Sequence, residues 1–335
     1  MNEVTIKRLF AVAGLLISVL LLVYFVIFAS RTFSMDALRQ LARPSAVLAI
    51  IAACLIYCLI VPISAWAWSR LLVTMGEKWS TLSTTAILSV TQIAKYVPGN
   101  IAQHVSRAAL ALSCGMNPGV FGATVILETL LVMGAAALVG ISFWLLTGEH
   151  YDALDTTFWW TLGSLCAGLA CAALIMLALL RSLPKLRNRY RCFQRWITAE
   201  IRVPGANIIC QTLAAYCLSY VVIGLVFWCV GQGVVTGKMP GYLYLTATFS
   251  LAWLVGFIAP GLPAGLGARE GIMTILLAGK MEPSDMLNLL IGMRLASVSG
   301  DLLCFIGGGI LIKFHLRKGW GNAKQTSPTT ISADK

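Results

Sequence analysis

The sequence predicts an all-α, polytopic membrane protein with six full spans and two oppositely oriented re-entrant helical hairpins, which we interpret as an inverted repeat. Three observations lead to this prediction. Of the 335 residues, 59% are hydrophobic and only 11% are charged, too few to cover the surface of a soluble domain. The apolar residues gather in runs of about 20, the length that a spanning helix needs. Two further apolar stretches are each broken at a Pro-Gly pair.

Six apolar runs are expected to cross the membrane as helices. They cover residues 9–29, 46–66, 120–146, 158–180, 208–230 and 286–312. Lys7 and Arg8 precede the first run, as in a secretory signal, but the apolar core of a signal is only about 7–15 residues long. We therefore interpret the first run as a retained anchor.

Basic residues between the runs predict the orientation of the chain. The segment 181–204 contains seven basic residues and one acid, so the positive-inside rule places it in the cytoplasm, together with both chain termini. The segment 31–43 disagrees with this topology, because it contains three arginines and should lie outside. The net charge of +12 thus reflects topology, and we expect no nucleic-acid partner.

One transmembrane domain is expected over residues 1–320, followed by a polar cytoplasmic tail over 321–335 that we expect to be disordered. Within the domain, the first repeat covers about 45–147 and the second about 208–313. Each contains a Pro-Gly pair with an arginine nine residues after the proline. The first broken stretch starts and ends on the cytoplasmic side and the second on the outer side, so the two hairpins enter from opposite faces. This pattern is typical of transporters whose site lies between inverted repeats.

The broken hairpins predict a site for an anion. Proline interrupts a helix and glycine allows a sharp turn, so a new half-helix with free N–H groups begins after each break. Arg107 and Arg269 follow these breaks, and an arginine at membrane depth is costly unless it has a function. Its planar guanidinium suits phosphate, so the two arginines together are expected to hold one lipid headgroup.

Further polar residues of the hairpins and spans complete the candidate site. The predicted substrate-binding residues are Lys95, Pro98, Gly99, Asn100, His104, Arg107, Gly265, Gly267, Arg269, Glu270 and Arg294. Two carboxylates within the spans, Glu128 and Asp301, are candidates for proton coupling.

Structural alternatives exist for most of these charges. Arg107 and Arg269 could extend to the interface and hold anionic lipid non-specifically, or pair internally with Glu128 and Glu270. Arg294 could form a structural pair with Asp301 or Glu128. Lys95 could extend to the membrane surface, and His104 could satisfy a backbone carbonyl.

Other function classes lack their motifs. The ten cysteines form no C-x-x-C pair and have no histidine cluster near them, so we expect no metal. The chain has no phosphate-binding loop for ATP hydrolysis, no H-E-x-x-H and no G-x-S-x-G, so we expect neither a cofactor nor an enzyme.

Three stretches carry a family resemblance: KYVPGNIAQHVSRAAL, PGLPAGLGAREG and GMRLASVSGDLL. Together they resemble the flippase-like transmembrane family typified by the membrane region of lysylphosphatidylglycerol synthases, the multiple peptide resistance proteins. The matching residues are Lys95, Tyr96, Pro98, Gly99, Asn100, Arg107, Pro263, Gly265, Gly267, Arg269, Glu270 and Arg294. The sequence departs at Ala264, where the family often has a second glycine. The resemblance implies a multi-pass protein of the bacterial inner membrane, and we expect a stand-alone member without the synthase domain.

The function predicted from these observations is translocation of an anionic or phosphate-bearing lipid between the leaflets of the inner membrane. The lipid could be a phospholipid or a polyprenyl-phosphate-linked sugar. The alternative is a non-transporting accessory protein that binds membrane enzymes of lipid or lipid-linked glycan synthesis through its basic segment 181–202. A third alternative, an enzyme with Glu270 or His104 as acid or base, lacks a recognisable nucleophile.

Overall fold

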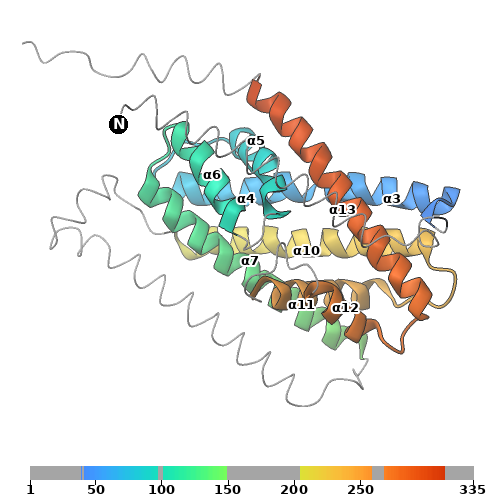
Figure 1. The fold of residues 1–335 in the computed structure, drawn as a ribbon. Coiled ribbons are helices and arrows are strands. Elements are labelled where there is room, and N and C mark those ends of the chain that lie inside the picture. Colours follow the sequence, from blue (N-terminus) through green and yellow to red (C-terminus); the bar gives the residue numbers. More distant parts are fainter. Residues whose placement is uncertain (1–38, 40, 97–100, 149–203, 259–267, 314–335) are drawn as a thin grey trace, which may run out of the picture.

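The computed structural model describes residues 39, 41–96, 101–148, 204–258 and 268–313, and every regular element in these ranges is a helix (Figure 1). Of the six predicted spans, those at 9–29 and 158–180 lie outside the described residues, as does the predicted tail at 321–335.

Within the described ranges, four helical stretches are long and apolar enough to cross a membrane. The first is Pro44–Thr74, which consists of α3 (Pro44–Tyr57) and α4 (Ile60–Thr74). The others are α7 (Pro118–Thr147), α10 (Ala206–Val234) and α13 (Pro283–Leu311). They confirm the predicted apolar helices at 46–66, 120–146, 208–230 and 286–312, and they show a multi-pass membrane protein.

Helix α7 shows how local sequence sets the ends of these spans. Proline at its first position has the backbone angle of a helix and needs no N–H partner. The Asn117 side chain accepts hydrogen bonds from the N–H groups of Gly119 and Val120. The helix ends at Gly148, whose φ of 64° is left-handed and therefore favours glycine.

Shorter helices connect the long ones. Between α4 and α7 lie α5 (Thr81–Thr91), the 3₁₀ helix η1 (Gln92–Tyr96) and α6 (Ile101–Ser113). Between α10 and α13 lie α11 (Tyr242–Ile258) and α12 (Ala268–Leu277). The Pro-Gly pairs fall between η1 and α6 and between α11 and α12, in segments outside the described residues.

A long helical stretch, shorter helices and a final long helix therefore follow one another twice, with the 3₁₀ helix η1 as an additional short element in the first half. The long helices that open the two halves are antiparallel: Ser45 at the start of α3 contacts Gly233 at the end of α10. At the other end, Arg70 of α4 donates to Gln211 near the start of α10. In Figure 1, α10 runs alongside the whole of α3 and α4.

The two halves also pack against each other through equivalent helices. Helix α5 of the first half packs on α13 of the second, and α11 of the second half packs on α7 of the first. Gly140 of α7 faces Leu251 of α11, where an added Cβ would lie 2.8 Å from the leucine Cδ2. Gly308 of α13 faces Ser89 of α5, where an added Cβ would lie 2.5 Å from the serine Cβ. Glycine is thus required for the close approach in both halves.

Apolar side chains also cover the outside of the long helices. Leu48, Leu55, Leu145, Leu146 and Ile310 are between 53% and 69% exposed. Exposed apolar surface on this scale is expected where lipid surrounds the protein. The polar groups described next lie inside.

Candidate functional site

A cavity of about 220 Å³ lies between the two halves, and we call it the central cavity. Its wall receives side chains from each described helix except α5. A second cavity of about 160 Å³, the side cavity, shares wall residues with it, among them Ser64, Gln92, Gln103 and His104. The sequence halves therefore meet around one polar interior.

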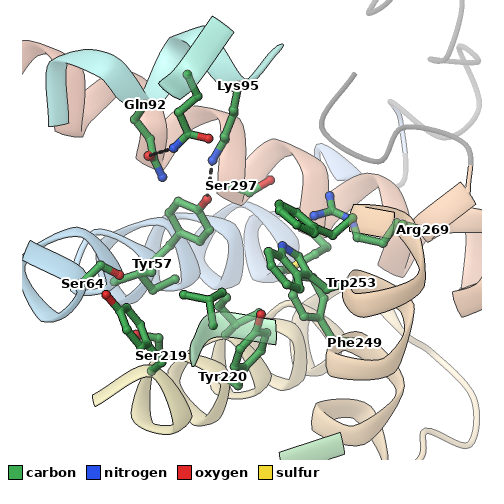
Figure 2. Close-up of a pocket in the computed structure, with 18 of the residues that line it drawn as sticks. Tyr57, Ser64, Gln92, Lys95, Ser219, Tyr220, Phe249, Trp253, Arg269 and Ser297 are labelled. Carbon is green, nitrogen blue, oxygen red and sulfur yellow. Dashed lines mark hydrogen bonds between the residues drawn. The ribbon is translucent and has the colours of Figure 1, made fainter. Parts of the chain in front are cut away.

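The central cavity is lined by three strongly basic side chains, Lys95, Arg269 and Arg294. Among the described residues, no aspartate or glutamate lines its wall. Figure 2 shows Lys95 and Arg269 reaching this cavity from different elements. Partly buried cations in a wall whose described residues include no acid favour an anionic ligand.

Arg269 and Arg294 share a single carboxylate. Arg294 Nη2 donates a hydrogen bond to Glu270 Oε1, and Arg269 Nε lies 3.5 Å from the same oxygen. Gly256 allows α12 to approach α11 here, because a Cβ at this position would lie 3.2 Å from the Arg269 Cβ. Two guanidinium groups on one carboxylate leave positive charge facing the cavity.

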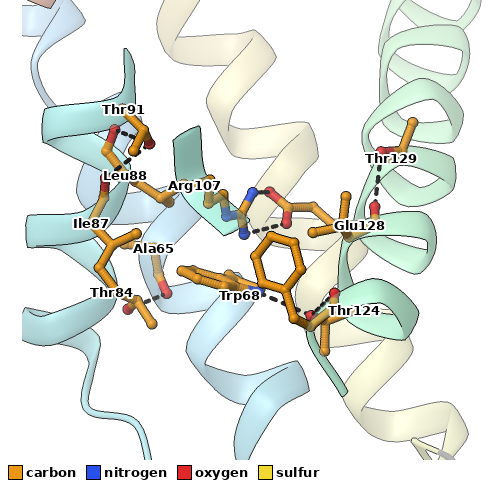
Figure 3. Close-up of polar contacts among 12 residues, drawn as sticks. Ala65, Trp68, Thr84, Ile87, Leu88, Thr91, Arg107, Thr124, Glu128 and Thr129 are labelled. Carbon is orange, nitrogen blue, oxygen red and sulfur yellow. Dashed lines mark hydrogen bonds and ion pairs between the residues drawn. The ribbon is translucent and has the colours of Figure 1, made fainter. Parts of the chain in front are cut away.

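Arg107 is held differently (Figure 3). Its two terminal nitrogens donate to the two oxygens of Glu128, at 3.1 and 2.6 Å. Its guanidinium carbon lies 3.7 Å from the ring centroid of Trp68, which in turn donates to Thr124. The side chain is only 3% exposed and lines the side cavity. The internal pair with Glu128, one of the two structural alternatives from the sequence, is present.

Lys95 forms a buried cluster with Asp301 and two tyrosines. Its Nζ lies 2.8 Å from Asp301 Oδ1 and 2.9 Å from the Tyr57 hydroxyl. Tyr57 and Tyr96 both donate to the Asp301 carboxylate, whose side chain is 1% exposed. The cluster joins η1 and α3 of the first half to α13 of the second.

Both structural alternatives that the sequence offered for Arg294 are therefore wrong. Arg294 pairs with Glu270, and with neither Asp301 nor Glu128. Arg294 and Asp301 share a helix face, but seven residues of helix separate them by about 10 Å along the axis, so each meets a different neighbour. The extension of Lys95 to the membrane surface is also wrong, because its ammonium group is hydrogen-bonded inside the protein.

His104 lies in the wall of both cavities. Its Nδ1 has no hydrogen-bond partner among the residues that the structure describes, so the predicted bond to a backbone carbonyl is not seen there. The remaining predicted site residues, Pro98, Gly99, Asn100, Gly265 and Gly267, lie outside the described residues.

Sequence reasoning missed the uncharged part of the site. Tyr216, Ser219 and Tyr220 of α10 line the central cavity, together with Trp253 and Phe257 of α11. A signal existed, since Tyr216, Ser219 and Tyr220 share one face of an otherwise apolar span by their three- and four-residue spacing. Because tyrosine and tryptophan are common in membrane proteins, this pattern did not stand out in the sequence.

Comparison with known families decides the relationship. The profile of the lysylphosphatidylglycerol synthase transmembrane region matches residues 11–303. The chain belongs to this family. The match includes both Pro-Gly pairs and all three basic residues of the central cavity, and it confirms the resemblance found in the sequence. The family relates the protein to lipid handling in the membrane. The search among curated proteins found no significant match.

Proposed function

We propose that the protein is a lipid translocator that moves an anionic or phosphate-bearing lipid between the leaflets of the bacterial inner membrane. The headgroup occupies the central cavity, while the hydrocarbon tails stay in the bilayer. The observation that carries this proposal is the set of three basic side chains in a cavity whose described wall contains no acid. Family membership supports the lipid as the class of substrate.

The charges around the two cavities support an anionic ligand. Four basic side chains, Lys95, Arg107, Arg269 and Arg294, face three carboxylates, those of Asp301, Glu128 and Glu270. One positive charge is therefore in excess among these residues, and it lies at the Arg269–Arg294 pair. Arg269 Nε has no hydrogen-bond partner among the described residues and is too far from Glu270 for a strong bond. A phosphate would supply both charge and acceptors.

The architecture supports movement between two faces of the membrane. The halves repeat one order of elements, their first long helices are antiparallel, and the central cavity lies between them. This arrangement is what an inverted repeat with oppositely oriented re-entrant hairpins requires. In such transporters, one half rocks against the other around a fixed site. Both chain termini face the cytoplasm in this proposal.

A reconstitution experiment tests the proposal. Purified protein is placed in liposomes with fluorescent phosphatidylglycerol, and the rate at which inner-leaflet label becomes reducible by dithionite is measured. We expect wild-type protein to accelerate this rate, and Arg269→Gln and Arg294→Gln to abolish the acceleration. The control is Arg70→Gln, which changes an exposed arginine outside both cavities and should leave the rate unchanged.

Two results would contradict the proposal. Equal acceleration by the wild type and by both cavity variants would show that translocation does not depend on the central cavity. Protein that binds the lipid but does not accelerate label access would instead favour the accessory role in lipid or glycan synthesis.

A further inference from the structure

The span Pro44–Thr74 is interrupted in its middle. Two residues, Cys58 and Leu59, form a turn that separates α3 from α4, and we call it the hinge turn. Their ψ angles of −20° and −21° are close to those of a 3₁₀ helix, and the Leu59 N–H donates to the carbonyl of Ile56, three residues before it. Such a turn inside a long helix often marks a hinge.

Pro62 explains the interruption. Proline has no N–H, so the carbonyl of Cys58, four residues earlier, lacks its usual helical donor, and the proline ring also pushes against that carbonyl. Pro62 is exposed on the outside of the helix, so this crowding lengthens the outer face and favours a bend toward the interior. Helix α10, the antiparallel counterpart in the second half, contains no proline and is unbroken from Ala206 to Val234.

The two sides of the hinge turn have different neighbours. Helix α3 packs closely on α13, where a Cβ added at Gly300 would lie 2.5 Å from the Tyr57 Cδ1. Helix α4 packs on α5 and α7, and its Trp68 donates a hydrogen bond to Thr124 of α7. Helix α10 contacts both sides. A bend at the turn therefore moves α3 and α13 relative to α4 and α7.

A buried cluster fixes the α3 side of the turn to α13. It consists of Tyr57, Lys95, Tyr96 and Asp301, and we call it the Lys95 cluster. The Tyr57 hydroxyl donates to Asp301 Oδ1 at 3.2 Å and accepts from Lys95 Nζ at 2.9 Å. Lys95 Nζ also donates to the same carboxylate oxygen at 2.8 Å. Because Tyr57 is the last residue before the turn, these bonds hold the turn in its present conformation.

The two charges of the Lys95 cluster differ in their access to the central cavity. Lys95 is 19% exposed and lines the cavity (Figure 2), whereas Asp301 is 1% exposed and lies behind the wall. An anion in the cavity therefore reaches the ammonium group and not the carboxylate. If the anion draws Lys95 away, Tyr57 and Asp301 each lose one bond. A buried carboxylate without its cation is costly, so the bound anion favours a conformation in which water reaches Asp301.

We propose that Pro62 makes the turn at Cys58 and Leu59 a hinge, that the Lys95 cluster holds this hinge, and that an anion which binds Lys95 in the central cavity releases it. This inference rests on the proposed function for the anion. It adds how occupation of the cavity starts the movement of the helices. Asp301 is then a positioning residue, which holds Lys95 and Tyr57 until the ligand arrives.

Pulsed electron paramagnetic resonance on the full-length protein measures the bend. Nitroxide labels are placed at Val47→Cys and Val73→Cys, with the ten native cysteines replaced by alanine. Both positions are exposed, at 41% and 54%, and lie about four and three helical turns from Pro62 on the same face. A straight helix would separate their axis positions by about 39 Å, and an additional inward bend of about 40° should lengthen the distance between the labels by about 2–3 Å.

Three samples separate the hinge from the cluster. In the wild-type background, dihexanoyl phosphatidylglycerol should lengthen the distance. Lys95→Met should give the longer distance without lipid, because the cluster is broken. Pro62→Ala should show no lengthening with lipid, because the helix is continuous. A control pair on α10, with labels at Cys210 and Gln232→Cys, should not change in any sample.

Two proline variants link the hinge to transport. Pro62→Ala restores the N–H for the Cys58 carbonyl and removes no buried packing, since Pro62 is exposed. The melting temperature should rise, and the rate of label access for fluorescent phosphatidylglycerol should fall about fivefold at unchanged affinity. Pro44 lies at the start of α3, where proline is tolerated, so Pro44→Ala should change none of these.

Four results would contradict these expectations in distinguishable ways. The same lipid-induced lengthening in Pro62→Ala as in the wild type would refute the hinge. So would an unchanged distance in wild-type protein that binds the lipid by calorimetry, and the proposed function would then stay intact. A wild-type distance in Lys95→Met would show that the cluster does not hold the turn, whether or not lipid binds. Failure of the wild type to bind the lipid would contradict the proposed function and, with it, release by an anion.

Discussion

The two Pro-Gly pairs are each followed by an arginine at the same spacing, but the two arginines have different surroundings. Arg107 and Arg269 each follow the proline of a Pro-Gly pair by nine residues. Arg107 is 3% exposed, with two bonds to Glu128 and a ring contact to Trp68. Arg269 is 13% exposed, lines the central cavity and shares Glu270 with Arg294. A repeated motif sets where the arginine lies, but its partners decide whether it stabilises the fold or is available to a ligand.

The largest effect should come from unpairing Arg107. Glu128→Gln leaves a buried guanidinium without its carboxylate, which should lower the free energy of unfolding by about 3–5 kcal/mol. The measurement is thermal unfolding in detergent. As a comparison, Glu270→Gln should lower the free energy of unfolding by less, because its partner Arg294 lines the central cavity and is not enclosed by protein on all sides. If Glu128→Gln has the melting temperature of the wild type, Arg107 does not stabilise the fold and the contrast between Arg107 and Arg269 is lost.

Arg269→Gln should show the opposite behaviour. It removes a charged donor from the cavity, so affinity for phosphatidylglycerol should fall by about 10- to 100-fold. The free energy of unfolding should change by less than about 1 kcal/mol, since the contacts of Arg269 among the described residues are weak: 3.5 Å to Glu270 and 5.3 Å to the ring centroid of Phe249. Calorimetric binding and thermal unfolding of one preparation give both values. A variant that unfolds readily yet still binds lipid would make Arg269 the structural arginine.

The Lys95–Asp301 pair should couple η1 to α13. A double-mutant cycle with Lys95→Met and Asp301→Leu should give a coupling free energy of about 1–2 kcal/mol. The double variant should lose less free energy of unfolding than the sum of the losses in the two single variants. Unfolding of the four proteins in detergent measures it. Strict additivity would show that η1 and α13 do not depend on each other.

The smallest effect concerns the close contact between α13 and α5, which has an equivalent between α7 and α11. Gly308→Ala brings a methyl group against Ser89 and should destabilise the protein by about 1 kcal/mol. The adjacent Gly307 and Gly309 have nothing within 4 Å of an added Cβ, so alanine there should stabilise by about 0.5–1 kcal/mol. Equal effects at the three positions would show that α13 and α5 are not in close contact.

Prediction from sequence was strongest for the spans and weakest for the partners of the charges. The helices α7 and α10 were expected to within a few residues, because the length of an apolar run is a local signal. The basic residues of the central cavity were also named in advance, since a charge in an apolar stretch is conspicuous. The tyrosines of α10 were missed, because only their unsatisfied hydroxyls distinguish them from ordinary core residues.

The sequence by itself determined which stretches are apolar helices, where Pro-Gly breaks them and which family the chain resembles. These properties depend on neighbouring residues and on the solvent that each helix needs. Only the tertiary structure decided the ion pairs and the cavity. Lys95 and Asp301 are 206 residues apart, and several helices could have brought a carboxylate to that ammonium group. Partners depend on how the two halves pack, and that packing determines which arginine is buried and which one faces the cavity.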